Sequence, residues 1–122
     1  MSNEIWSINL SDAASQDIRQ IVSWTAKNFG PLQARGYSNT LSSALKELSA
    51  GPRIEGVKRR NEIGRGICTL HVARNGRKGR HFVMFRVSTA NGQRIINVLR
   101  LLHDSMDLHR HAPQDDPPEL MQ

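Results

Sequence analysis

The sequence has little cysteine and few aromatic residues. Cys68 is the only cysteine, and phenylalanine, tryptophan and tyrosine together make up 5% of the 122 residues. A single cysteine cannot form a disulfide within the chain, so nothing in the sequence points to an oxidising compartment. No window approaches the roughly 20 apolar residues of a membrane-spanning helix, and Glu4 interrupts the N-terminus where a signal peptide needs an apolar run. We therefore expect a cytoplasmic protein that does not enter a membrane.

The sequence also lacks the signatures of conventional enzymes. Neither a Gly-x-Ser-x-Gly motif nor a glycine-rich phosphate-binding loop occurs. The histidines His103, His109 and His111 show no zinc-ligand spacing with Cys68. The apolar neighbours of Cys68 favour a small buried thiol over a metal ligand. The sequence therefore predicts no cofactor, no metal site and no conventional catalytic centre.

Positive charge, in contrast, is concentrated in one block. The formal net charge is +6, and residues 51–80 alone carry nine basic and two acidic side chains, whereas the flanking stretches are close to neutral. Such a run is tolerated when a phosphate backbone or an acidic protein neutralises it, although a solvated surface that favours solubility is the simpler alternative. The block contains no stacking aromatic residue and no recognition helix. Direct nucleic-acid binding would therefore be electrostatic and not sequence-specific.

Apolar periodicity in the first half predicts a strand and two helices. Residues 6–10 alternate between apolar and polar, which is typical of a strand with one buried face. Ser11 is a good N-cap, and apolar residues at helical spacing predict a helix over residues 11–28. The Gly30-Pro31 pair ends it and begins a second helix over residues 31–50. Because the link is so short, the two helices are expected to pack antiparallel.

The second half changes to the two-residue period of strands. Residues 53–66 have no periodicity and indicate a basic loop. Three stretches rich in Val, Ile, Leu, Phe and Thr follow, separated by two Asn-Gly turn signals, and they predict a three-stranded antiparallel meander. These strands cover residues 67–74, 81–87 and 94–103.

These elements predict an α+β fold of order βααβββ. A lone N-terminal strand cannot satisfy its backbone groups, so it is expected to join the meander in a twisted antiparallel sheet with the helical hairpin on one face. A chain of this length supports one core. We predict one domain over residues 1–111 and a disordered, acidic, proline-rich tail over residues 112–122.

Several local motifs carry a family resemblance. Residues 11–18 are similar to the opening of the first helix in the ParE branch of the ParE/RelE toxins, from bacterial type II toxin–antitoxin systems. Residues 29–48 resemble that family's helix link and second helix. Residues 98–107, with the His109-Arg110-His111 run after them, are similar to the ParE ending. The basic connection over residues 74–80 is longer than in typical members.

The resemblance implies a non-enzymatic toxin that inhibits DNA gyrase by binding it. A co-expressed, ParD-like antitoxin is expected to neutralise it in a hetero-oligomer, across the apolar faces around Trp24, Tyr37 and Leu41. The residues expected to bind a partner come from the basic block and the last strand. They are Lys58, Arg59, Arg60, Arg65, Arg77, Lys78, Arg80, Arg100 and His103.

An alternative function is that of the RelE branch, a metal-independent endonuclease that cuts messenger RNA on the ribosome. That reaction needs a base, an acid and cations around one phosphate, and Arg65, Arg86 and His103 are the candidates if they converge on one sheet face. Arg86 equally fits a solvated sheet face, as does Arg100, and His103 fits a capping role. The single tyrosine, Tyr37, falls in the second helix, so the sequence favours the binding toxin.

Overall fold

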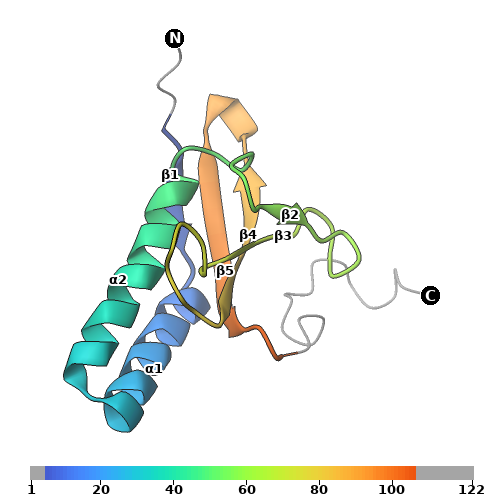
Figure 1. The fold of residues 1–122 in the computed structure, drawn as a ribbon. Helices are drawn as coiled ribbons and strands as arrows, with labels where there is room; N and C mark the ends of the chain where they lie inside the picture. Colours follow the sequence, from blue (N-terminus) through green and yellow to red (C-terminus); the bar gives the residue numbers. More distant parts are fainter. Residues whose placement is uncertain (1–4, 107–122) are drawn as a thin grey trace.

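The fold is a helical hairpin packed on one face of a five-stranded sheet (Figure 1). It comes from a computed structural model that describes residues 5–106, so the predicted tail and the residues His109 and His111 lie outside the described residues. The elements are β1 (Ser7–Leu10), α1 (Asp12–Phe29), α2 (Pro31–Leu48), β2 (Lys58–Arg59), β3 (Cys68–His71), β4 (His81–Ser88), the 3-10 turn η1 (Ala90–Gly92) and β5 (Ile95–His103).

The helical hairpin follows the local signals in the sequence. The hydroxyl of Ser11 accepts a hydrogen bond from the Ala14 N–H at 3.0 Å, and such a cap typically stabilises a helix by about 1 kcal/mol. Gly30 links the helices with φ of 92°, a left-handed value that favours glycine, and Pro31 begins α2. Both helices match the predicted ranges within two residues. Neither of the helices described is long and apolar enough to span a membrane.

The sheet is mixed, which corrects the predicted antiparallel sheet. Its strand order is β1-β5-β4-β3-β2, and β1 pairs with β5 in parallel, from Ser7 opposite Ile95 to Leu10 opposite Val98. The other pairs are antiparallel, as the meander predicted. Alternation along a strand shows which face is buried but does not specify the direction of its neighbour.

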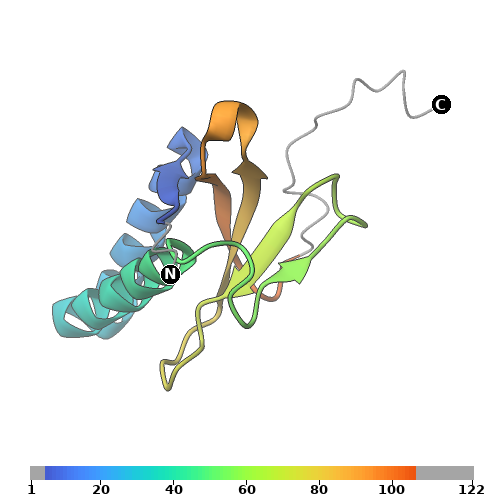
Figure 2. The same cartoon turned by 90° about the horizontal axis from the view of Figure 1, so that it is seen from above.

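The predicted basic loop contains an additional strand. Lys58 and Arg59 form β2, which pairs with Thr69 and Cys68 of β3 at the sheet edge. A strand of two residues is too short to show any periodicity, so sequence patterning could not reveal it. Figure 2 shows this edge projecting away from the helical hairpin.

The connection between β3 and β4 is tied to α2 through one carboxylate. Glu47 of α2 accepts hydrogen bonds from Arg74 Nε at 2.8 Å, Asn75 Nδ2 at 2.8 Å and Arg77 Nη2 at 2.7 Å. Asn75 and Gly76 have φ of 52° and 80° and form the predicted turn. These hydrogen bonds hold the turn against α2. The first meander strand ends at His71, three residues earlier than predicted.

Buried side chains lie on both faces of the sheet. On the helical side, Leu41 and Leu48 of α2 pack in one cluster with Leu70, Phe85 and Ile96 of the sheet. Leu41 is 1% exposed, so the expectation that it faces an antitoxin is wrong. The spacing that placed it on an apolar stripe is that of a core position. A second cluster, on the other face, contains Ile67, Met84 and Leu102.

Candidate functional site

A concave groove lies between the helical hairpin and the sheet. It has a volume of about 950 Å³, and its lining is predominantly apolar with one polar end. Its outer rim carries two large exposed aromatic residues, Trp24 and Phe29, whose side chains are 59% and 64% exposed. Their ring centroids lie 5.7 Å apart in edge-to-face contact. Exposed aromatic residues beside an apolar groove are typical of a protein-binding surface.

An ion pair forms part of the groove wall. Asp17 of α1 accepts bonds from Arg100 Nε at 2.7 Å and Nη2 at 3.0 Å, and its Oδ2 also accepts the Leu101 N–H at 3.0 Å. These side-chain hydrogen bonds with Asp17 raise the pKa of Arg100. Arg100 was predicted to bind a partner, but its guanidinium is committed to holding α1 against β5. The arginine therefore has a structural role.

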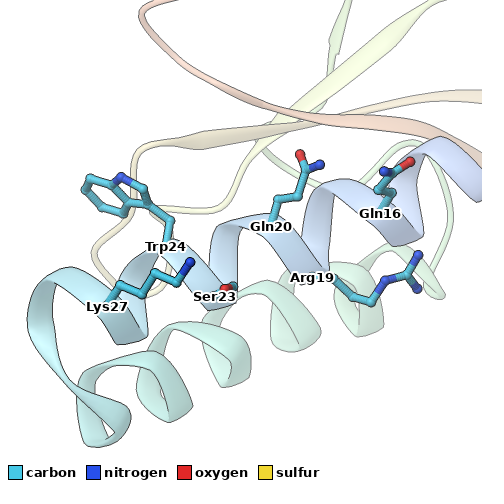
Figure 3. A pocket seen from close by; sticks show the side chains of 6 residues that line it. All are labelled: Gln16, Arg19, Gln20, Ser23, Trp24 and Lys27. Atoms are coloured by element: carbon cyan, nitrogen blue, oxygen red, sulfur yellow. The ribbon is translucent and has the colours of Figure 1, made fainter.

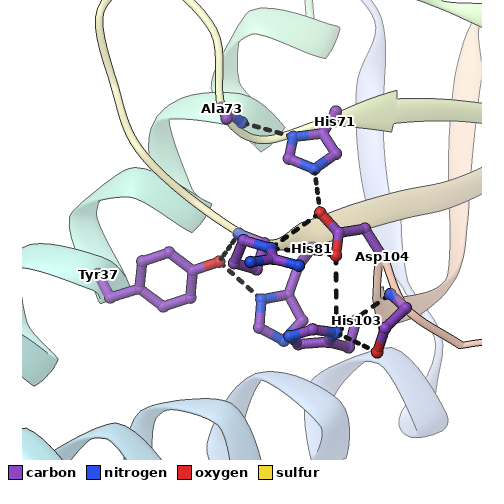
Figure 4. A network of polar contacts seen from close by, with 8 residues as sticks. Tyr37, His71, Ala73, His81, His103 and Asp104 are labelled. Carbon is purple, nitrogen blue, oxygen red and sulfur yellow. Dashed lines mark hydrogen bonds and ion pairs between the residues drawn. The ribbon is translucent and has the colours of Figure 1, made fainter.

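The polar end of the groove begins with a pair formed by Tyr37 and His81 (Figure 4). The Tyr37 hydroxyl accepts a hydrogen bond from the Arg80 N–H at 3.0 Å and lies 2.6 Å from His81 Nδ1. The hydroxyl proton is thus directed to Nδ1, and a neutral His81 carries its own proton on Nε2. Burial, followed by the nearby His103, lowers the pKa of His81 to about 4. Burial also raises the pKa of Tyr37.

His103 lies beside His81, with the ring centroids 5.3 Å apart. Its Nδ1 accepts the Ser105 N–H at 3.1 Å and lies 2.7 Å from Ser105 Oγ, so a neutral His103 also carries its proton on Nε2. This is the capping role at the end of a strand that the sequence allowed. No hydrogen bond within residues 5–106 uses Nε2 of either histidine.

Asp104 lies beside the polar end, where its Oδ1 is 3.6 Å from His103 Nδ1, and it joins this end to β3. Its Oδ2 accepts the His71 Nε2–H at 3.0 Å, while both carboxylate oxygens lie 3.2 Å from Arg80 Nε. His71 Nδ1 in turn accepts the Ala73 N–H at 3.0 Å, which fixes its tautomer. The hydrogen bond from His71, together with Arg80, lowers the pKa of Asp104 despite an opposing desolvation effect.

The residues proposed for RNA cleavage do not converge. Arg86 Nε donates to the Arg65 carbonyl at 2.8 Å, so these two are neighbours. His103, however, pairs across the sheet with His81, five residues along β4 from Arg86. At the rise of a strand this is about 17 Å. Arg86 also lies two residues after Met84 in β4 and therefore shares its face, which points away from the helices, whereas His103 lines the groove on the helical side. The expected convergence on one sheet face is wrong.

The basic block divides between two regions. Lys58, Arg59 and Arg65 are exposed on β2 and the loop that follows it. Arg60 is half-buried there, since its Nε donates to Thr69 Oγ1 at 3.1 Å and its guanidinium lies 5.8 Å from the Phe82 ring. The other region is the β3–β4 connection. There Arg77 is held by Glu47, while Lys78 and Arg80 line the polar end of the groove.

The outer face of α1 carries a second, shallower depression of about 490 Å³ (Figure 3). Apart from Trp24, which lines both depressions, its side chains are polar and lie along one side of the helix. They are Gln16, Arg19, Gln20, Ser23 and Lys27. This composition is typical of a solvated helix face. The depression adds no separate chemistry to the groove.

Three members of the polar end were missed by sequence reasoning, namely His71, His81 and Asp104. Each stands at the end or the start of a strand, and only the pairing of β3, β4 and β5 brings them together. Their positions beside strand boundaries are the one signal that could have selected them. Within residues 5–106, no group of three or more His, Cys, Asp or Glu side chains is arranged to hold a metal ion.

The lowered pKa of His81 predicts a loss of stability in mild acid. The unfolded chain takes up a proton near pH 6.5 and the folded chain only near about pH 4, so the stability present above 6.5 falls as the pH decreases through that window. A fully buried ring would lose roughly 3 kcal/mol. Because the His81 ring is only half-buried, screening reduces this to about 1–2 kcal/mol. Urea unfolding measured between these pH values should show the decrease, and His81→Gln should flatten it.

Known proteins are similar to this chain in sequence. A family model described as the ParE toxin of type II toxin–antitoxin systems, parDE, matches residues 8–108. Toxin ParE1 from two strains of Mycobacterium tuberculosis is 32% identical over 102 residues, which cover 84% of this chain and 93% of that protein.

Two solved structures share the fold. A chain of the chromosomal ParDE system from P. aeruginosa has a TM-score of 0.64 at 21% identity, over 83% of this chain and 98% of its own. A chain of the RelBE2 toxin–antitoxin complex from Mycobacterium tuberculosis has a TM-score of 0.51 at 18% identity, over 81% and 98%. On the strength of the family match and the ParE1 identity, this chain belongs to the ParE toxin family of type II toxin–antitoxin systems.

Proposed function

We propose that this toxin inhibits DNA gyrase by binding it, and that a ParD-like antitoxin neutralises it in a hetero-oligomeric complex. Membership of the ParE family is the observation that carries the proposal. One structural relative belongs to a ParDE system and another to a toxin–antitoxin complex, which supports an antitoxin as the partner of this chain.

The positions of the candidate nuclease residues favour a binding toxin over an RNA endonuclease. In-line cleavage needs its base, acid and cations around a single phosphate. Arg86 and His103 lie on opposite faces of the sheet, about 17 Å apart along the strand, and cannot serve one phosphate. The likeness to the RelBE2 chain concerns the fold, and a fold alone does not specify function.

The groove fits the antitoxin better than it fits gyrase. An amphipathic segment binds by laying its apolar side chains into a groove, with aromatic anchors at the rim. Trp24 and Phe29 supply that rim. The exposed cations of β2, Lys58 and Arg59, lie at the opposite edge of the sheet from β1 and remain accessible for a target. We therefore assign the groove to the antitoxin and the β2 edge to gyrase.

A supercoiling assay tests the proposed target directly. Purified toxin added to gyrase and relaxed plasmid is expected to block supercoiling or to trap cleaved DNA. Prior addition of a ParD-like antitoxin should prevent this effect. If gyrase is unaffected while translating ribosomes yield cut messenger RNA, the endonuclease is the correct function and the proposal fails.

Reversing the charge of the β2 edge should weaken gyrase inhibition. In the variant Lys58→Glu with Arg59→Glu, we expect about tenfold more toxin to be needed for half-inhibition, because two favourable charges become repulsive. Both side chains are exposed, so the fold should persist. Arg60 is left unchanged because its hydrogen bond to Thr69 belongs to the fold.

The matched control for this variant is Lys27→Glu with Arg35→Glu. It makes the same change in net charge at exposed positions of the helical hairpin. Circular dichroism should confirm that both double variants are folded. Equal inhibition by the two would show that the β2 cations serve solubility and do not bind gyrase.

A further inference from the structure

The carboxylates at the polar end of the groove are already engaged. Asp17 accepts three hydrogen bonds, two from Arg100 and one from the Leu101 N–H. Asp104 is shared between His71 and Arg80. Asp104 Oδ1 also lies 3.6 Å from His103 Nδ1, but within residues 5–106 neither carboxylate pairs with the Lys78 ammonium or with the Nε2 atom of His81 or His103.

The remaining donors come from three side chains. His81 and His103 use their Nδ1 atoms as acceptors inside the fold, which leaves the Nε2–H of each neutral ring without a hydrogen bond within residues 5–106. Lys78 is exposed and lines the groove with them. The ammonium and the two imidazole Nε2–H groups are three donors on one part of the groove lining, and Asp104, the carboxylate beside them, approaches His103 through Nδ1 at 3.6 Å and not through Nε2.

We propose that His81, His103 and Lys78 bind a carboxylate side chain carried by the antitoxin segment that fills the groove. The carboxylate would accept hydrogen bonds from the imidazole Nε2–H groups and pair with the Lys78 ammonium. This inference rests on the proposed function, and it adds the chemistry by which the segment is recognised: an aspartate or glutamate placed at one end of an apolar stretch.

The shape of the site favours a peptide carboxylate over a phosphate of nucleic acid. The groove is apolar along most of its lining, and Ile21 and the exposed Trp24 lie on its α1 side. A sugar–phosphate backbone would bury its charges against that surface without partners, which is unfavourable. An amphipathic peptide matches both the apolar length and the single positive end.

The first experiment measures the affinity of the proposed ParD-like antitoxin for three toxin variants, by isothermal titration. Lys78→Met and His103→Gln should each weaken binding about fivefold, since each removes one partner of a partly exposed charge pair. The control Lys58→Met removes an exposed lysine on β2 and should leave affinity unchanged. Thermal melting of each variant confirms that it is folded.

A pH series provides a measurement that a merely structural role would not change. An imidazole that gains a carboxylate partner takes up a proton on binding, so affinity should rise about threefold from about pH 8 to about pH 6.5. In His103→Gln this rise should be smaller. The charged and titratable groups around the two rings are Tyr37 of α2, His71 of β3, Asp17 of α1, and Lys78, Arg80, Arg100 and Asp104. These groups are present in both the unsubstituted toxin and His103→Gln. A difference between the two in the pH dependence of affinity therefore reports on His103.

Substitutions in the antitoxin complete the test. Changing its acidic residues one at a time to the corresponding amide should locate a single position whose loss is not additive with Lys78→Met. If no such position exists, or if Lys78→Met binds as tightly as Lys58→Met, the proposal is wrong. Competition by inorganic phosphate with no effect of the amide changes would instead indicate a phosphate site and overturn it. The affinity of the antitoxin is measured without gyrase. A failure of the toxin to inhibit gyrase would therefore contradict the proposed target but would not affect this result.

Discussion

Replacing Asp17 by alanine is expected to lower the free energy of unfolding by about 3 kcal/mol and the Tm by roughly 10 °C. The Asp17 residue is 8% exposed, and it connects α1 to β5 through Arg100 and the Leu101 N–H. Its removal leaves a partly buried guanidinium without its counter-charge and a buried N–H without an acceptor. Both losses destabilise the folded state and neither has a counterpart in the unfolded chain.

The control for this prediction is Asp12→Ala. Asp12 is also an aspartate of α1, but it is exposed in the first turn, where its effect on the helix dipole is within about 0.5 kcal/mol. Denaturant unfolding of the two variants gives the comparison directly. For a chain of this size, a difference in Tm of only a few degrees means a small difference in stability. If the Tm values of Asp17→Ala and Asp12→Ala differ by no more than that, the ion pair does not hold the helix to the sheet.

Replacing Trp24 by alanine is expected to weaken antitoxin binding by about 30-fold to 100-fold while leaving the fold intact. Tryptophan side chains at the centre of an interface commonly contribute about 2 kcal/mol or more to the binding free energy. A loss of about 2 kcal/mol corresponds to an affinity about 30-fold lower. Trp24 is 59% exposed, contacts the Phe29 ring at the groove rim and belongs to neither core cluster of the described residues, so its removal opens no cavity in the core.

Ile5→Ala is the matched control for Trp24→Ala. Ile5 is an apolar residue that is 76% exposed, and it does not line the groove. Titration of both variants with the antitoxin, alongside their melting curves, separates binding from folding. Equal affinities for the two variants would place the antitoxin elsewhere on the toxin and remove the groove from the proposed function.

Local signals in the sequence predicted the elements well. Ser11 marks the start of α1, Gly30 and Pro31 mark the helix link, and Asn75-Gly76 marks a turn, because each depends on backbone preferences of the residues themselves. The family resemblance added the toxin class, and the family match confirms that class. The assignments of individual partner-binding residues stay predictions.

The features that sequence patterning predicted poorly are those that depend on contacts between distant segments. An apolar stripe at helical spacing does not distinguish a core position, such as Leu41, from an exposed position, such as Trp24 on the neighbouring helix. Likewise, the sequence does not distinguish a solvated arginine in a strand from one that, like Arg100, is hydrogen-bonded to an aspartate 83 residues away. Burial and pairing are decided by what packs against the residue.

The sequence by itself determined the helical hairpin, the meander, the location of the positive charge and the family. Each of these follows from neighbours in the chain or from motifs along it. The tertiary structure alone decided that β1 runs parallel to β5, that Arg86 and His103 lie apart, and that His81 and His103 stand together at the end of an apolar groove. The physical reason is that strand register sets which side chains become neighbours, and register depends on hydrogen bonds between residues far apart in sequence.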